Sequence, residues 1–163
     1  MWKSIAAGAL GGLAAAFAMN QFENVWSIAS KALSDGHQQQ QTSNEIEEDS
    51  TVNAAKMISR NVFHHELTED EKKWAGPLVH YGLGAELGAF YGALSEVMPA
   101  ATTCRGLGYG TAVWLAGDEI AVPVLGLSKP DSEVPLSSHL NALGSHLIYG
   151  FVTDLVLRLC TMK

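Results

Sequence analysis

Four apolar stretches, each close to the length of a membrane-spanning helix, constrain this chain most. They cover residues 4–26, 77–98, 105–127 and 139–160 and are rich in alanine, glycine, leucine and valine. A helix needs about 20 apolar residues to cross a bilayer core. We therefore predict an all-α integral membrane protein, a four-helix bundle that forms one membrane domain over residues 1–163.

Charged residues gather between the first two stretches, in residues 34–75, which is why the mean hydropathy is only +0.09. Residues 34–50 are polar and predict a flexible linker. Apolar residues recur with a helical period over residues 51–66, which predicts an amphipathic helix lying on the membrane or on the bundle. Thr68 followed by Glu71 is a capping-box pattern that predicts the start of another helix.

Lysine and arginine residues in short loops predict the orientation of the spans, because such loops stay on the cytoplasmic side. Lys3, Arg105 and Arg158 fall on one side of a four-span chain. Both termini are then cytoplasmic, and residues 34–75 lie on the outer side. The N-terminal apolar run, with its Ala16-Phe17-Ala18 triplet, also has features of a secretory signal peptide. We interpret it as the first span.

Glycines recur at a spacing of four residues within the predicted spans. Small residues let membrane helices approach each other closely, so we interpret these glycines as helix-packing positions of the glycine-zipper type. Span two also carries Gly82 and Ala89 on its opposite side, which predicts a neighbour on each side of that helix. The predicted packing positions are Gly8, Gly12, Gly84, Gly88, Gly92, Gly106 and Gly110.

Polar residues inside the spans predict the candidate site. Counted inward from the outer ends, most of them lie about 10 to 14 Å deep at ~1.5 Å per helical residue. Polar groups in hydrocarbon are costly, so they mark a site or a helix contact. Pro123 lacks an N–H and leaves the carbonyl of Glu119 without its usual helical partner at the same depth. The predicted polar layer consists of Asn20, Glu86, Asp118, Glu119 and His146.

Three interpretations of this layer stay open. In the first, the carboxyl groups and His146 form hydrogen bonds between helices and have only a structural role. In the second, they relay protons or ions from the outer face. In the third, a metal or haem is bound between the helices, with His80, His139 and His146 as candidate ligands. No diagnostic ligand spacing is present, so we predict no cofactor.

Other functional classes find no support in the sequence. There is no P-loop, nucleophile elbow, dinucleotide-binding glycine pattern or zinc-protease helix, so we do not predict an enzyme. The formal net charge of -7 comes largely from the polar segment, and the chain has no basic patch for nucleic acid. Cys104 and Cys160 lack metal-ligand spacing and are interpreted as free thiols.

Several motifs resemble the YagU-like family of bacterial inner-membrane proteins, which has no assigned function. The resemblance covers about residues 50–160 and implies the bacterial inner membrane, with residues 34–75 in the periplasm. Family members often carry histidine where this chain has Asp118, so no shared role is implied at that position. The motifs are the run from Gly106 to Leu127, His80-Tyr81 followed by glycine-rich sequence to Tyr91-Gly92, Pro99, and His146-x-x-Tyr149-Gly150.

Two functional hypotheses follow from the sequence. The first is an uncharacterised inner-membrane protein whose polar layer handles protons or an ion. The alternative is a structural or accessory subunit that packs its glycine faces against other membrane helices. The expected partners are the lipid bilayer and either further copies of this chain or the subunits of a larger membrane complex.

Overall fold

The computed structural model describes residues 1–33, 50–127 and 135–161, and all regular structure within these ranges is helical. The all-α prediction is therefore confirmed for the described residues. The predicted linker 34–50 lies outside them, except for Ser50. The elements are α1 Trp2–Leu33, α2 Ser50–Ile58, the π-helix η1 Ser59–Phe63, α3 Glu69–Val97, the 3₁₀ helix η2 Pro99–Gly106, α4 Leu107–Trp114, the π-helix η3 Leu115–Ala121, α5 Val122–Val124 and α6 Leu136–Thr161.

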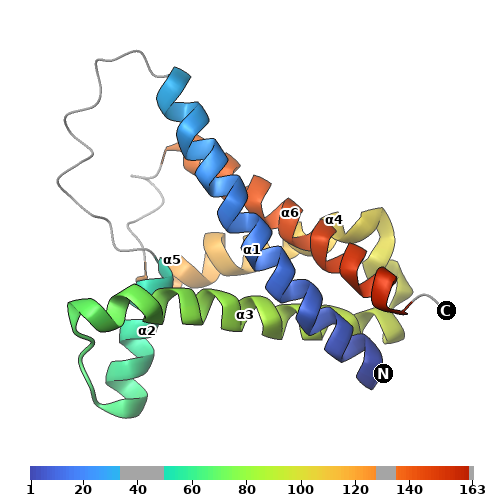
Figure 1. Cartoon of the computed structure of the whole chain (residues 1–163), viewed down its shortest axis with the longest axis horizontal. Helices are drawn as coiled ribbons and strands as arrows, with labels where there is room; N and C mark the ends of the chain where they lie inside the picture. Colours follow the sequence, from blue (N-terminus) through green and yellow to red (C-terminus); the bar gives the residue numbers. More distant parts are fainter. Residues whose placement is uncertain (34–49, 128–134, 162–163) are drawn as a thin grey trace.

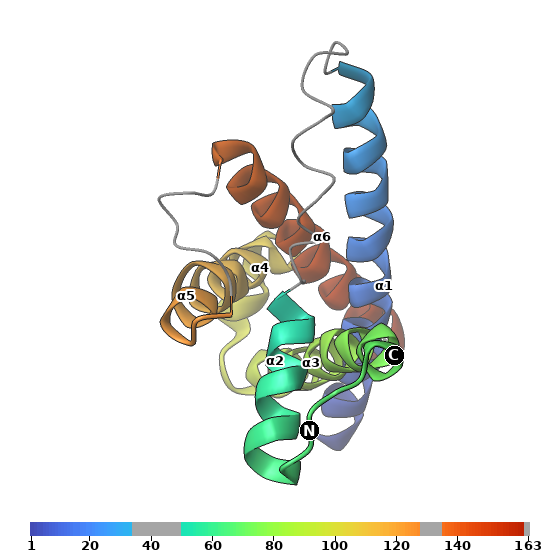
Figure 2. The ribbon, with the colours of Figure 1, turned by 90° about the vertical axis from the view of Figure 1, so that its left-hand side faces the viewer.

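Four long helical segments run in alternating directions (Figures 1 and 2). α1 crosses α3, the chain returns through α4, η3 and α5, and α6 runs back beside α1. α1 also packs closely on α6, where Gly11 lies against the backbone of Thr153. The start of α1 and the end of α6 therefore lie at the same end of the bundle (Figure 1).

α1 and α3 cross where glycines of the two helices face each other. A β-carbon added at Gly8 would overlap the carbonyl oxygen of Gly88, and one added at Gly88 would overlap that of Gly8. Only residues without a side chain let two helix backbones approach this closely. The facing pairs along this crossing are Gly8 with Gly88, Gly12 with Gly84, and Ser4 with Gly92.

A second glycine crossing joins α4 to α6. A β-carbon at Gly110 would overlap the carbonyl oxygen of His146, and Gly106 and Gly150 face each other's carbonyl oxygens in the same way. Gly106 also has a φ of +76°, a conformation that residues with a side chain rarely adopt. All seven glycines named from the sequence therefore lie at one of the two crossings.

Three buried tyrosines fill the space between the helices. The rings of Tyr91 in α3 and Tyr109 in α4 have centroids 4.6 Å apart, and Tyr149 of α6 belongs to the same core. Tyr109 donates to the carbonyl of Leu87 and Tyr149 to the carbonyl of Gly84, each at 2.7 Å. Because a buried tyrosine hydroxyl needs a partner, these bonds connect α3 to α4 and α6. The core also contains Ala7, Ala15, Met19 and Leu157.

The residues before α3 form an arm made of α2 and η1, which we call the outer arm (residues 50–63). A helix is thus present where the amphipathic segment 51–66 was predicted, and it ends at His64, whose φ of 52° is left-handed. α2 packs against the start of α3 (Figure 2), where Val52 covers Gly76. The side chain of Asn53 also donates to the carbonyl of Leu127 at 2.9 Å.

The predicted capping box at the start of α3 is confirmed. The backbone N–H of Glu71 donates to the hydroxyl oxygen of Thr68 at 3.4 Å, and the Glu71 carboxylate accepts from the backbone N–H of Thr68 at 2.7 Å. These two bonds satisfy N–H groups that a helix start leaves without partners. α3 then continues as one helix through Pro77.

Two helices are long and apolar enough to cross a membrane by length and composition, α1 over Trp2–Ala32 and α6 over Leu136–Thr161. Within the described residues, the other two predicted spans do not meet this standard. In α3 the mean hydropathy is lowered by glycines, His80 and Glu86, and the third predicted span is interrupted by η3. A four-span topology therefore stays a prediction.

Candidate site: acid–histidine pairs between η3 and α6

The helix that carries the candidate site widens into a π-turn at η3. The N–H of Val122 bonds to the carbonyl of Gly117, five residues back, which is the π-helical pattern. Pro123 follows, and without an N–H it cannot close an α-helical bond to the carbonyl of Glu119. Such π segments within helices frequently occur at functional sites. Here the segment carries two adjacent acids, Asp118 and Glu119.

Each acid of η3 meets a histidine of α6. Nδ1 of His139 lies 2.7 Å from Oε1 of Glu119, and Nδ1 of His146 lies 3.5 Å from Oδ2 of Asp118. The two histidines are seven residues apart, two helical turns, so both face η3. We call these four residues the acid–histidine cluster. Three of them belong to the predicted layer, and His139 was named only as a candidate metal ligand.

The cluster is largely withdrawn from the surface, and its two pairs differ in geometry. The exposed fraction is 21% for the side chain of Glu119 and 13% for that of His146, against 38% for Asp118. Nδ1 of His146 also lies 3.0 Å from the carbonyl oxygen of Ala142, closer than it lies to Asp118. The Glu119–His139 pair is therefore the more closely hydrogen-bonded of the two.

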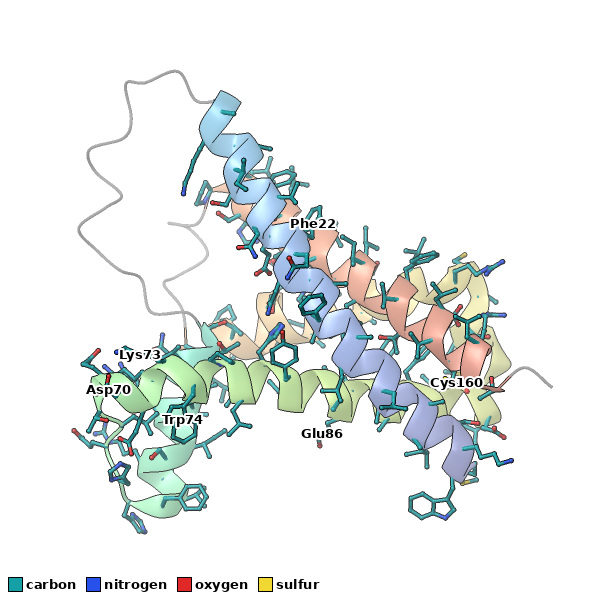
Figure 3. All side chains as sticks on the ribbon, in the orientation of Figure 1. Phe22, Asp70, Lys73, Trp74, Glu86 and Cys160 are labelled. Carbon is teal, nitrogen blue, oxygen red and sulfur yellow. The ribbon has the colours of Figure 1, made fainter. Side chains whose placement is uncertain are left out.

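Two residues of the predicted layer lie elsewhere. Glu86 is exposed and points away from the other helices in Figure 3. Asn20 donates to the hydroxyl of Tyr81 at 3.2 Å and so joins α1 to α3. Glu86 faces outward because Gly84 and Gly88 hold the opposite side of α3 against α1. The structure thus brings Asp118, Glu119 and His146 together, but not Glu86.

The three candidate metal ligands do not meet at one point. His80 lies at the α1–α3 contact, where its Nε2 is 3.3 Å from the carbonyl oxygen of Ala16. His139 and His146 each face a different acid of η3. In residues 1–33, 50–127 and 135–161, no group of three or more histidine, cysteine, aspartate or glutamate side chains is arranged to hold a metal ion.

An ion pair with a buried acid, at the opposite end of α6, was not named from the sequence. Asp154 is 1% exposed and accepts from the hydroxyl of Tyr91 at 2.8 Å and from Nε of Arg158 at 2.6 Å. Arg158 also donates to the carbonyl of Thr102 at 3.0 Å. We call Tyr91, Asp154 and Arg158 the inner cluster. The sequence does contain a sign of this cluster. Asp154 is an acid inside a predicted span and lies four residues before Arg158, which is the spacing of a helical ion pair.

α1 contributes a further acid, Glu23, which contacts α6 at the residue before His146. Ser145, which is fully buried, lies 3.4 Å from Oε1 of Glu23 and donates to it. Ser145 directly precedes His146, so the acid–histidine cluster and this contact lie one residue apart on α6. Glu23 sits near the predicted outer end of the first span, where an acid is an ordinary residue, and the sequence alone did not distinguish it.

With its helical fold and two apolar helices, the chain is a candidate helical membrane protein. Only 39% of the most apolar segment of α1 and 33% of that of α6 is buried, so most of each segment faces outward, unlike the core helix of a soluble protein. Residues 45–155 match the family described as Protein of unknown function (DUF1440), and the chain belongs to this family. No curated protein and no solved structure matches the chain.

Proposed function

We propose that this protein is an integral protein of the bacterial inner membrane, of the YagU-like type, that handles protons or another ion through the acid–histidine cluster. The proposal places four spans in the bilayer, with both termini in the cytoplasm and the outer arm in the periplasm. The alternating helix directions and the shared end of α1 and α6 support this arrangement. It requires no cofactor and no enzymatic step.

The observation that carries the proposal is the contact of 2.7 Å between Glu119 and His139, beside the Asp118–His146 pair. A carboxyl group and an imidazole in contact can share one proton and pass it on, because histidine changes charge near neutral pH. Ionisable groups within a membrane segment also mark ion pathways by default. The two adjacent pairs therefore offer successive proton sites along α6.

The polar groups along α6 outline the route of such a pathway. His139 is near the outer end of α6, and His146 lies about 10 Å further in at ~1.5 Å per residue. About 12 Å beyond His146 is Asp154, which is bonded to Tyr91 and Arg158. A proton entering from the periplasm would reach His139 first, and the inner cluster would close the cytoplasmic end.

Proton flux into proteoliposomes tests this proposal. With a pH-sensitive dye inside and an imposed pH gradient, we expect Glu119→Gln and His146→Ala each to lower the flux roughly tenfold or more, as loss of a proton-transfer group does. Glu86→Gln is the matched control, because Glu86 is exposed and outside the cluster. Unchanged flux in both cluster variants, with wild-type flux above that of empty vesicles, would remove the relay.

A second candidate function, a subunit that packs against other membrane helices, is favoured by the outward face of α3. Glu86 is exposed in the middle of this helix, and a β-carbon added at Gly82, one turn earlier, meets nothing within 4 Å. A carboxyl group facing lipid at that depth is costly, and a contacting helix from a further copy or a larger complex would cover it. Purification in mild detergent tests this candidate: a monomer whose mass is the same in wild type and Gly82→Leu would exclude it.

A further inference from the structure

The outer arm packs across the start of α3. Ala55 is buried, Val52 covers Gly76, and the Asn53 side chain donates to the carbonyl of Leu127 at 2.9 Å. The far end of the arm is closed by Ser59, whose hydroxyl donates to the carbonyl of His65 at 2.8 Å. In Figures 1 and 2, α2 runs across the start of α3 rather than along it. If α3 crosses the membrane, the arm must lie in the membrane plane.

The outer arm nevertheless leaves large apolar side chains uncovered. The exposed fraction is 43% for Ile58, 64% for Val62 and 71% for Phe63. In a π-helix, with bonds between residues five apart, positions four and five residues apart share a face, so these three side chains gather on one side of η1. Trp74, near the start of α3, is 56% exposed as well. Several neighbouring exposed apolar side chains indicate a contact surface.

The charge of the arm identifies the surface that it fits. Residues 50–63 contain Lys56 and Arg60 and no aspartate or glutamate. Arg60 and Asn61 lie between Ile58 and Val62 in sequence and so occupy the other side of the turn. A helix with apolar residues on one side and basic residues on the other lies at the boundary between lipid headgroups and acyl chains. Tryptophan is enriched at the same depth.

We propose that the outer arm is a membrane-interface anchor on the periplasmic side. Ile58, Val62 and Phe63 insert below the lipid headgroups, and Lys56 and Arg60 lie among anionic headgroups. This inference rests on the membrane placement of α3 in the proposed function, and it does not depend on proton handling. The sequence predicted that this segment lies either on the membrane or on the bundle. In the proposed arrangement both apply, because α2 packs on α3 and η1 contacts lipid.

Fluorescence quenching by brominated lipid tests the anchor on the full-length protein. Trp2, Trp26, Trp74 and Trp114 are replaced by phenylalanine, and one tryptophan is returned at a time, as Phe63→Trp or as Asn61→Trp. Both positions are exposed and lie two residues apart, so they form a matched pair. In vesicles of brominated phosphatidylcholine, we expect the probe at position 63 to be blue-shifted and strongly quenched, and the probe at position 61 to be quenched little.

Equal quenching at positions 61 and 63, or no quenching at 63, would overturn the anchor. A probe at 63 that is blue-shifted only at high protein-to-lipid ratio would assign the surface to a second copy of the chain and would also overturn it. A variant that keeps only Trp26, on α1, reports membrane insertion by itself. Quenched Trp26 with unquenched position 63 rejects the anchor alone, whereas unquenched Trp26 rejects the membrane placement.

The basic residues give a second measurement. We expect vesicles containing phosphatidylglycerol to deepen the position of the Phe63→Trp probe relative to vesicles of phosphatidylcholine alone, because anionic headgroups attract the arm. Arg60→Glu should abolish this difference, and Arg60→Lys should retain it. An unchanged response to phosphatidylglycerol in Arg60→Glu would contradict the role of the basic side.

Discussion

The hydroxyl of Tyr91 and the carboxylate of Asp154 lie 2.8 Å apart, although 63 residues separate them in sequence. The bond joins α3 to α6 at the end of the bundle where α1 begins. Asp154 is almost fully buried, and it is also held by Arg158. A buried carboxylate is tolerated only when its oxygens are hydrogen-bonded, so both partners are needed to keep this acid between the helices.

Loss of the Tyr91 hydroxyl and loss of the acid itself should destabilise the protein by different amounts. We expect Tyr91→Phe to cost about 1 kcal/mol, since Asp154 keeps its ion pair. Asp154→Ala should cost more, about 2 kcal/mol, because it leaves the buried tyrosine hydroxyl and the half-exposed Arg158 without their acceptor. Thermal unfolding in detergent measures both. Tyr81→Phe, which loses only the longer bond from Asn20, is the control, and a greater loss in that variant than in Tyr91→Phe would contradict the role of the inner cluster.

The glycine crossing of α1 and α3 predicts a sharp difference between two similar substitutions. At Gly88 a β-carbon overlaps the carbonyl oxygen of Gly8, and at Gly108 it meets nothing within 4 Å. We expect Gly88→Ala to destabilise by about 1–3 kcal/mol through overpacking, and Gly88→Leu by more. Gly108→Ala should be stabilising by roughly 0.5–1 kcal/mol, the helix preference of alanine over glycine. Melting profiles compare the variants, and equal shifts for Gly88→Ala and Gly108→Ala would refute the crossing.

Some parts of this structure could be predicted from the sequence because they depend on local spacing. The capping box of Thr68 and Glu71 requires only a fixed separation along the chain, and the helix it starts is where the sequence places it. Glycines four residues apart lie on one side of a helix, whichever helix they face. That Gly84 and Gly88 face α1, whereas the equally spaced Gly106 and Gly110 face α6, is seen only in the structure.

Other parts depend on which side of each helix packs against its neighbours, and the sequence contains little information about that. Counting residues inward gives Glu86 the same depth as Glu119, but only packing decides that Glu86 faces outward. Pro123 indicated a missing hydrogen bond near Glu119, but the residue pattern did not predict the π-turn over Leu115–Ala121 that carries both acids. Asp154 lies within a predicted span, as Glu119 does, so its position alone marks it as a candidate helix contact.

The stabilisation that Glu71 gives to the start of α3 should be lost at low pH. The backbone N–H and hydroxyl of Thr68, together with His65, hold the pKa of Glu71 at about 2, below its ordinary value of 4.5. Because this pKa is lower in the folded state, the stabilisation is complete above pH 4.5 and is lost as the pH falls toward 2. We expect wild type to melt higher than Glu71→Gln above pH 4.5, and the difference to shrink on acidification. Glu69→Gln, whose acid pairs with Lys72, is the control; a gap that widens in acid would contradict the assignment.

The two pairs of the acid–histidine cluster should differ in the interaction free energy between acid and histidine. Glu119 and His139 are 2.7 Å apart, whereas Asp118 and His146 are 3.5 Å apart and His146 is closer to a backbone carbonyl. Double-mutant cycles with Glu119→Gln and His139→Gln, and with Asp118→Asn and His146→Gln, separate the pair energies from the cost of each single change. In lipid vesicles we expect about 1–2 kcal/mol of coupling for the first pair and about 0.5 kcal/mol for the second, the range of polar contacts between membrane helices. A larger coupling between Asp118 and His146 would show that the closer contact does not dominate the site.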